Sequence, residues 1–525
     1  MPHETLTRRR WLQNASAAPA LLSLLRCGPA APRPPNILFC FADDQSWPHA
    51  GAYGDSGVST PAFDRVAREG VLFSRSYTAC PSCTPSRSAV LTGRHIWQVE
   101  EGGVLYGTIP PKFPLVTHLL EDAGYHVGYT GKPWAPGDWQ AGGLTRHPNG
   151  KEYNARKIEP PEGVDARDYA ANFDDFLAAR PSDAPFFFWF GSTEPHRVYG
   201  EGLGRQSGKS PANVTVPSYW PDDETIRNDI LDYYFEIEWF DQHIARMLAR
   251  LEELGELNNT IVVVTSDNGM PFPRAKVNLY GRGVHMPLAI RWGDRIAGGR
   301  VIDDFVSHID FAPTFLEAAG LAPPAGVAGR SLMPQLTSTA QGVIDPERDH
   351  VLTALERHTM CRPGGATYPM RAIHTAEYLY IRNFEPDRWP TGGPDFISSN
   401  KTYHGDVDGC PTKDFMTDPD NQQRYAREYE LCFGKRPAEE LYRIADDPDQ
   451  VRNLAGVPEY NETKQQLWSR LSEQLRATGD PRIEGRDPWQ AYVYHQTTGF
   501  GATFNRSLPE SERSEAEDRG AHKPE

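Results

Sequence analysis

A thiol, a helix-start signal and an arginine lie within five residues of one another in the run Cys83-Thr84-Pro85-Ser86-Arg87. Pro85 favours the first turn of a helix, where its missing N–H would have no partner in any case. We therefore expect Cys83 just outside a helix N-terminus, beside free backbone N–H groups and the positive end of the helix dipole. Arg87, four residues on, can reach the same face. This arrangement suits attack on an anionic, tetrahedral oxyacid.

Hard oxygen ligands follow two apolar runs that are far apart in the chain. Asp43 and Asp44 end the first run, and Asp267 and Asn268 end the second. Such a set favours Ca²⁺ or Mg²⁺ over zinc, because nitrogen and sulfur ligands are lacking. Either pair alone is better explained as a cap of a helix or turn. It is their combination with Cys83 that indicates a metal site.

The run Cys83–Arg87, with Thr92-Gly93 after it, resembles the C-x-P-S-R signature of type I sulfatases. The two acidic pairs match that family's metal site in order and context. The resemblance extends from Asn36 to about Ala455. It implies an alkaline-phosphatase-like fold, a calcium ion that also contacts the modified Cys83, and conversion of this cysteine to formylglycine by a formylglycine-generating enzyme.

In that family the hydrate of formylglycine carries two hydroxyls on one carbon. One hydroxyl attacks sulfur and displaces the leaving group. The other, once deprotonated, collapses the adduct by breaking the C–O bond, which releases sulfate and restores the aldehyde. The metal assists by lowering the pKa of the hydroxyl and neutralising charge. Judged from the residue alone, Cys83 is also open to two other readings, a nucleophilic thiol or an inert buried one.

Two lysines and a proton donor for the reaction come from three further segments and join Arg87. Arg87, Lys132 and Lys276 are the candidate clamp for sulfate oxygens. Lys132 lies in a G-K step that matches the family, whereas Arg274 competes with Lys276 for its place. His196, in a P-H step after an apolar run, is the candidate that donates a proton to the departing group.

One position departs from the family. The usual pattern is G-K-x-H, and its histidine helps to deprotonate the second hydroxyl, but Trp134 stands at that place. Trp134 either stacks on a sugar face or belongs to the core. The base is therefore open, and four other histidines are candidates for it: His95, His126, His285 and His308.

Apolar runs that end in polar residues alternate with helical patterns over the first two thirds of the chain. The predicted strands are 36–42, 127–132, 185–190 and 260–265, and the predicted helices are 61–69, 115–123, 226–254 and 313–319. This alternation predicts an α/β fold with a mostly parallel sheet flanked by helices. Ligands bind at the carboxyl ends of such strands, so the strand-end residues should converge on one pocket.

The pattern changes past residue 345. Short strands with half-exposed faces are predicted at 371–373, 378–382 and 440–443, followed by an amphipathic helix over 461–475. These elements predict a smaller antiparallel α+β domain over 346–505, packed on a catalytic domain over 34–345. Residues 506–525 are charged and poor in apolar side chains, which predicts a disordered tail.

The 525-residue chain has a formal net charge of −16. This charge argues against a nucleic-acid partner, whose binding needs a basic surface, but allows a local cationic pocket for a sulfated substrate. No run reaches the roughly 18 apolar residues of a membrane span. The cysteine pattern fits neither a disulfide framework nor a zinc site, although pairing of Cys410 with Cys432 is open. The seven cysteines are 27, 40, 80, 83, 361, 410 and 432.

The N-terminus has the layout of an export signal. Residues 7–13 resemble a twin-arginine motif, an apolar run follows over 15–25, and cleavage is expected near 28–33. This predicts removal of a segment over about 1–33 and a periplasmic or secreted enzyme. Arg26 before Cys27 fits a lipoprotein signal poorly, and a disordered basic N-terminus is the alternative to any signal.

Together these features predict a sulfatase that hydrolyses a sulfate ester or sulfamate of a sulfated carbohydrate. The stretch 266–273 resembles heparan N-sulfatases (sulfamidases), which favours N-sulfoglucosamine as the substrate. Two alternatives are open: a phosphonate or phosphate ester hydrolase of the same superfamily, and a catalytically silent protein that binds sulfated glycans. The histidine missing at Trp134 is the one feature that favours the silent protein.

Overall fold

Four apolar runs form the centre of an eight-stranded sheet in the computed structural model of the chain, which describes residues 33–398 and 401–496. They are the parallel strands β1 (Asn36–Ala42), β4 (His126–Gly131), β6 (Phe186–Gly191) and β7 (Thr260–Ser266). β1 pairs with β6 on one side and β7 on the other. Every residue of β1, β6 and β7 is buried, as expected for a sheet covered on both faces. The four predicted strands are confirmed.

The remaining strands extend this sheet in the order β10-β2-β9-β7-β1-β6-β4-β5. Antiparallel pairing occurs on both edges of β9, which lies between β7 and β2. These outer strands are β2 (Val71–Phe73), β5 (Lys151–Glu152), β9 (Leu288–Arg291) and β10 (Arg300–Ile302). A separate small sheet contains β3 (Ser76–Tyr77), β8 (His285–Met286) and β11 (Val306–Ser307).

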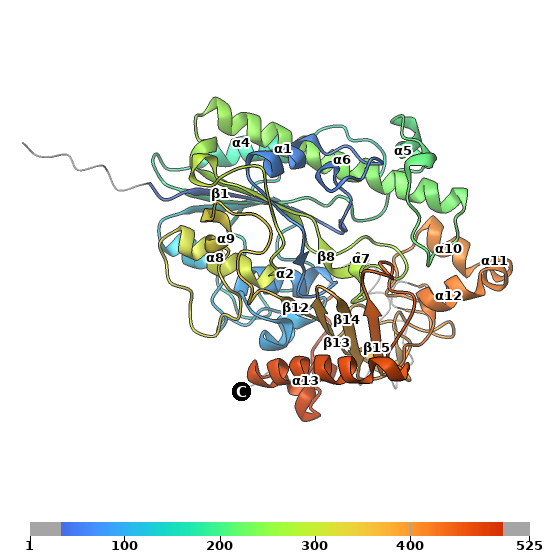
Figure 1. Ribbon diagram of the computed structural model, residues 1–525. Coiled ribbons are helices and arrows are strands. Elements are labelled where there is room, and N and C mark those ends of the chain that lie inside the picture. Colours follow the sequence, from blue (N-terminus) through green and yellow to red (C-terminus); the bar gives the residue numbers. More distant parts are fainter. Residues whose placement is uncertain (1–32, 399–400, 497–525) are drawn as a thin grey trace, which may run out of the picture. The chain divides into compact units, whose positions relative to one another are not determined.

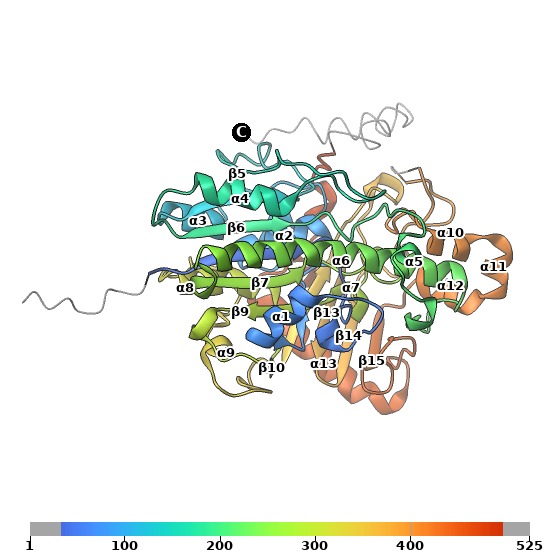
Figure 2. The same cartoon turned by 90° about the horizontal axis from the view of Figure 1, so that it is seen from above.

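Helices cover both faces of the large sheet (Figure 1). On one face lie α1 (Pro61–Glu69), α4 (Tyr169–Ala179) and α6 (Glu224–Glu253), and on the other lie α2 (Cys83–Thr92), α3 (Val116–Asp122) and α8 (Phe311–Ala318). Leu38 and Cys40 of β1 pack with the first group, and Phe39 and Phe41 with the second. Figure 2 shows the long helix α6 running over the sheet. The predicted helices are confirmed.

A four-stranded antiparallel sheet follows, in the order β12-β13-β14-β15. Its strands are β12 (His350–Leu355), β13 (Met370–Thr375), β14 (Tyr378–Asn383) and β15 (Glu439–Arg443). The prediction that such strands are half-exposed is wrong, because consecutive residues such as Ala372 and Ile373 are fully buried. Both faces are covered, one of them by α13 (Asn461–Ala477), which contacts β13 and β14. The domain boundary at residue 345 stays a prediction.

Three short helices, α10 (Pro411–Thr417), α11 (Pro419–Arg424) and α12 (Ala426–Phe433), lie between β14 and β15 in the chain. The six cysteines of the described residues are free, so Cys410 and Cys432 are not paired. The Cys410 sulfur accepts a hydrogen bond from the Lys413 N–H at the start of α10, and Cys432 donates to the Tyr219 carbonyl.

Two predictions concern residues outside the described ranges, the export segment with Cys27 and the C-terminal tail. Within the described ranges, no helix combines the length and the apolar character that a membrane crossing requires.

Candidate active site

The carboxyl ends of four parallel strands place most of the predicted site residues at one edge of the sheet. β1 leads into Asp43 and Asp44, β4 into Lys132, and β7 into Asp267, whose N–H donates to the Ala42 carbonyl at 3.1 Å. β6 leads through a short loop to His196. The neighbouring strands run parallel, so their carboxyl ends meet at the same edge of the sheet.

Helix α2 carries the candidate nucleophile at its N-terminus. Its first residue is Cys83 and its N-cap is Ser82, so the prediction that Cys83 lies just outside the helix is off by one residue. The Cys83 thiol donates to Asp43 Oδ1 over 3.4 Å. Burial, reinforced by Asp43, raises the pKa of the Cys83 thiol well above its usual range. An unmodified Cys83 is therefore a poor thiolate nucleophile.

The acidic residues form a cradle that fits a hard cation. Ligand atoms of Asp43, Asp44 and Cys83 lie within 4.8 Å of one another. Asn268 donates through Nδ2 to Asp44 Oδ1 at 2.5 Å, yet its buried Oδ1 has no hydrogen-bond partner in the described part of the chain. A buried amide oxygen without a donor is the expected state of a metal ligand. The residues therefore fit Ca²⁺ or Mg²⁺.

The electrostatics of this cradle also favour a bound divalent cation. Asp44, Asp267 and Asp43 are buried together. Burial, with Asp43 adding to it, raises the pKa of Asp267 to about 7, and burial also raises the pKa of Asp44. Three carboxylates in one buried place repel one another, and a divalent cation would relieve that repulsion.

Three cations neutralise part of this charge. Arg87 donates through Nε to Asp267 Oδ2 at 2.9 Å, and Lys132 pairs with Asp43. Lys276 contacts Asp44 Oδ2 at 2.7 Å. The structure thus brings together all three residues of the predicted clamp.

Arg274, the competitor of Lys276, lies outside the site. It donates to the Leu431 carbonyl at 2.6 Å and stacks over the Tyr280 ring. Its backbone has a positive φ of 64°, and the lysine two residues later contacts the carboxylates.

His196 lies at a more open position, with about a third of its side chain exposed. Its Nδ1 is 2.7 Å from the Arg197 carbonyl oxygen. A carbonyl can only accept, so Nδ1 carries the hydrogen, and Nε2 faces Asp44 Oδ2 at 3.8 Å. His196, Asp43 and Lys132 line one cavity of about 330 Å³.

The residues from 35 to 321 match the sequence model of the sulfatase family. The chain belongs to the sulfatase family. Residues 275–388 of this sulfatase also match the model described as N-sulphoglucosamine sulphohydrolase, C-terminal.

Two curated relatives illustrate the similarity. Human N-sulphoglucosamine sulphohydrolase is 28% identical over 515 residues, which cover 88% of this chain and 93% of the relative. An ulvan-active sulfatase of Formosa agariphila is 26% identical over 502 residues, which cover 86% and 76%.

Solved structures share the alkaline-phosphatase-like fold. One is a protein in complex with its substrate D-glucosamine-2-N,6-O-disulfate, with a TM-score of 0.60 and 20% identity over 87% of this chain and 99% of that one. Another is the phosphonate monoester hydrolase of Agrobacterium radiobacter, with a TM-score of 0.58 and 16% identity over 85% and 96%. At these identities the likeness concerns the fold.

Trp134 of this sulfatase is a core residue rather than a sugar-stacking surface. Its side chain is 2% exposed and packs in the large apolar cluster, with Nε1 donating to Ser88 Oγ at 2.8 Å.

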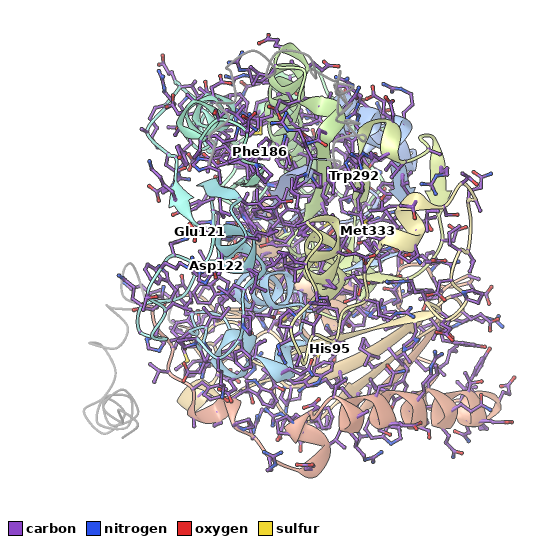
Figure 3. All side chains as sticks on the ribbon, turned by 90° about the vertical axis from the view of Figure 1, so that its left-hand side faces the viewer. His95, Glu121, Asp122, Phe186, Trp292 and Met333 are labelled. Carbon is purple, nitrogen blue, oxygen red and sulfur yellow. The ribbon has the colours of Figure 1, made fainter. Side chains whose placement is uncertain are left out.

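The four histidines that were candidates for the missing base lie elsewhere. His126 opens β4, at the far end of the strand from the site, and stacks on Phe176. His285 stacks on Trp47, and His308 is buried in contact with Phe311. His95 stacks on Trp97 and lies near the C-terminal elements (Figure 3). Among the described residues, none of the four contacts Cys83 or the acidic cradle.

Sequence reasoning missed two residues of the site, Asp408 and His358. Asp408 accepts a hydrogen bond from Lys276 Nζ at 3.2 Å, and His358 Nδ1 lies 2.8 Å from Ser82 Oγ. His358 lies three residues after the end of β12, a strand of the antiparallel sheet, and no motif marks it. Asp408 lies in an irregular loop, and no pattern marks it.

Replacing Glu236 with glutamine should stabilise the protein. Glu236 lines the same cavity, is 1% exposed, and neither of its carboxyl oxygens has a hydrogen-bond partner among the described residues. Burial, reinforced by Glu194, raises the pKa of Glu236 to about 9. The unfolded chain ionises near its ordinary value, so folding loses stability as pH rises from about 4.5 to 9. At pH 7 the Glu236→Gln variant should gain about 3 kcal/mol in free energy of unfolding.

Urea unfolding at pH 5, 7 and 8.5 measures this effect. The gain should shrink toward zero at pH 5 and grow at pH 8.5. Glu253→Gln, at a side chain that is 67% exposed, is the matched control and should change nothing. A gain for Glu236→Gln that does not depend on pH would contradict the ionisation argument.

Proposed function

We propose that this sulfatase cleaves the sulfamate of N-sulfoglucosamine or of a related heparan-type sugar. The observation that carries the proposal is the match of residues 275–388 to the C-terminal model of N-sulphoglucosamine sulphohydrolase. The similarity to the human enzyme of that name also supports it, because the matched residues cover 93% of that enzyme.

The proposal includes formylglycine at position 83 and a calcium ion held by Asp43, Asp44, Asp267 and Asn268. Together these groups would supply a hydroxyl nucleophile and a positive charge that lowers the pKa of that hydroxyl. The buried amide oxygen of Asn268 and the acidic cradle support the ion. The C-x-P-S-R run at the start of a buried helix supports the modification.

The chain's own cations hold the reacting groups in place. Arg87 is bonded to Asp267 through Nε and, through Nη1, to the carbonyls of Lys132 and Pro133, so the carboxylate cannot rotate away. Lys132 and Lys276 neutralise Asp43 and Asp44, and their cationic groups would also stabilise the anionic sulfuryl group of the substrate.

His196 is placed to serve the leaving group. Its Nε2 is the ring nitrogen that faces the site, because Nδ1 is engaged with the Arg197 carbonyl. A sulfamate releases an amine, which needs a proton as the S–N bond breaks. His196 in its protonated form supplies that proton from the open side of the cavity.

A panel of small substrates tests this proposal. We expect N-sulfoglucosamine to give a kcat/KM at least about 100-fold above glucosamine 6-sulfate and galactosamine 6-sulfate, because the site must recognise the amine. An aryl phosphonate ester completes the panel. Faster turnover of the phosphonate would favour the phosphonate hydrolase alternative, and faster turnover of a 6-sulfate would overturn the sulfamate assignment.

A further inference from the structure

Ser82 and His358 form a hydrogen-bonded pair directly before residue 83. Ser82 is the N-cap of α2, with φ −154° and ψ 137°, but its side chain accepts no hydrogen bond from the helix. A serine at this position normally caps the helix and contributes about 1 kcal/mol. Here its Oγ lies 2.8 Å from Nδ1 of His358 instead. The hydroxyl positions a histidine ring at the cost of a helix cap.

The loop that carries His358 is fixed on both sides of the ring. The Arg357 carbonyl accepts from the Leu105 N–H at 3.2 Å. Thr359 donates to Asp406 Oδ1 through both its N–H, at 2.7 Å, and its hydroxyl, at 2.6 Å. His358 itself is 5% exposed. The ring therefore has one defined place.

The charges around His358 are those of the active site. Lys276, Asp408 and His196 act on it electrostatically, together with Asp406. Lys276 and His196 both pair with Asp44. His358 contacts Ser82, the residue directly before Cys83, and so lies beside the start of α2 and within the field of these charges. Burial lowers the pKa of His358 to about 4, which keeps the ring neutral and able to accept a proton at neutral pH.

The two nitrogens of the ring have different surroundings. Nδ1 is held by Ser82, whereas Nε2 makes no hydrogen bond within residues 33–398 and 401–496. The Ser82 hydroxyl can accept from Nδ1 or donate to it. In the tautomer in which Nδ1–H donates to Ser82 Oγ, which base catalysis at Nε2 requires, the lone pair of Nε2 is free. This is the usual arrangement of a general base, in which one nitrogen is anchored and the other takes the proton.

We propose that His358 is the general base that completes sulfate release, in place of the histidine that Trp134 replaces. The inference rests on the proposed chemistry at residue 83. After sulfate transfer, the carbon of residue 83 carries one hydroxyl and one sulfate ester. Nε2 takes the hydroxyl proton, and the O–H electron pair forms the second bond of the aldehyde. The C–O bond to sulfate breaks and its electrons leave with sulfate, so no oxidant or other co-reactant is needed.

The other polar groups of the site are already committed. Lys132 and Lys276 are ion-paired as cations with Asp43 and Asp44. His196 approaches from the open cavity, where the leaving group departs. Ser82 acts as a positioning residue, because it contacts the imidazole and fixes which nitrogen is free.

The test uses full-length protein with formylglycine at position 83 and 4-nitrophenyl sulfate as substrate. His358→Gln keeps the volume of the ring and a hydrogen bond to Ser82, and thermal unfolding checks that it folds. We expect kcat to fall about 100- to 10,000-fold with KM little changed. Because only the second step stalls, quenched protein should carry one sulfuryl group on the peptide that contains residue 83.

Two further variants sharpen the result. His358→Ala should recover turnover when imidazole is added, because a small base fills the space. His285→Gln, at a stacked histidine outside the site, should keep full activity and show no adduct. Ser82→Ala should give a smaller loss of kcat than His358→Gln, with a smaller fraction of adduct.

The inference is overturned if His358→Gln retains wild-type kcat, or if it folds and loses activity without accumulating the sulfated peptide. The aryl substrate separates this result from the choice of sugar. Wild-type protein that cleaves 4-nitrophenyl sulfate but not N-sulfoglucosamine would contradict the proposed substrate and leave the His358 measurement valid.

Discussion

Replacement of Cys83 with alanine should abolish sulfate release by this sulfatase while leaving the fold intact. The loss in kcat should be on the order of 10⁵-fold or more, as is typical when the attacking group is removed. The side chain is buried at the first residue of α2, and the change removes one sulfur atom. We therefore expect the free energy of unfolding to fall by only about 1 kcal/mol. Ion chromatography of sulfate and thermal unfolding measure both effects.

Cys80→Ala is the matched control, because Cys80 is also fully buried and precedes α2 by three residues. It should keep full activity. Mass spectrometry of the wild-type peptide that contains residue 83 should show the aldehyde or its hydrate when a formylglycine-generating enzyme is present. Sulfate release by a plain cysteine would contradict the formylglycine chemistry. A plain cysteine that binds sulfated sugar without releasing sulfate would support the silent glycan-binding alternative.

Strand ends explain why so much of the site could be predicted from the sequence. β1, β6 and β7 are almost continuous apolar runs, as is typical of strands in a sheet covered on both faces, and β4 is a shorter buried strand beside them. Once they are parallel neighbours, Asp43, Lys132 and Asp267 must lie at one edge. The same rule could have excluded His126, because it opens β4 and therefore lies at the opposite end.

The remaining residues of the site depend on packing that no local pattern records. Asp408 contacts Lys276, and His358 contacts Ser82, from loops in the C-terminal part of the chain that are set by tertiary contacts. The choice between Lys276 and Arg274 depends on the course of an irregular loop, which has positive φ angles at Arg274 and Val277 and points the two side chains to different partners. A tryptophan suits both a sugar-binding surface and an apolar core. Only the packing of Trp134 inside the apolar cluster and its hydrogen bond to Ser88 show that it is a core residue.

Removal of the divalent cation should silence this sulfatase reversibly and lower its stability. The cradle buries three carboxylates close together, and a bound cation would compensate their repulsion. Dialysis against a chelator should remove sulfate release, and added Ca²⁺ should restore it. Calcium at about 100 times its Kd should add about 2.7 kcal/mol to the free energy of unfolding. A thermal unfolding curve recorded at increasing calcium concentrations measures this without reference to activity.

Two variants connect that stabilisation to the residues named. Asp44→Asn removes a charge and should weaken calcium binding at least about 100-fold. Asn268→Leu is nearly isosteric, and it removes an amide oxygen that has no other partner in the described chain. Without calcium its free energy of unfolding should stay within about 1 kcal/mol of wild type. The variant loses the hydrogen bond to Asp44, but it also loses a buried amide oxygen that has no donor, and the two effects oppose each other. With calcium it should lose most of the stabilisation.

Asp165→Asn is the control, at a carboxyl that lines the same cavity but pairs with Arg167. It should respond to calcium as the wild type does. An unchanged calcium response in both Asp44→Asn and Asn268→Leu would place the cation elsewhere. A loss of the calcium response in Asp44→Asn and Asn268→Leu, but not in Asp165→Asn, would mean that Asp44 and the Asn268 amide oxygen bind the ion.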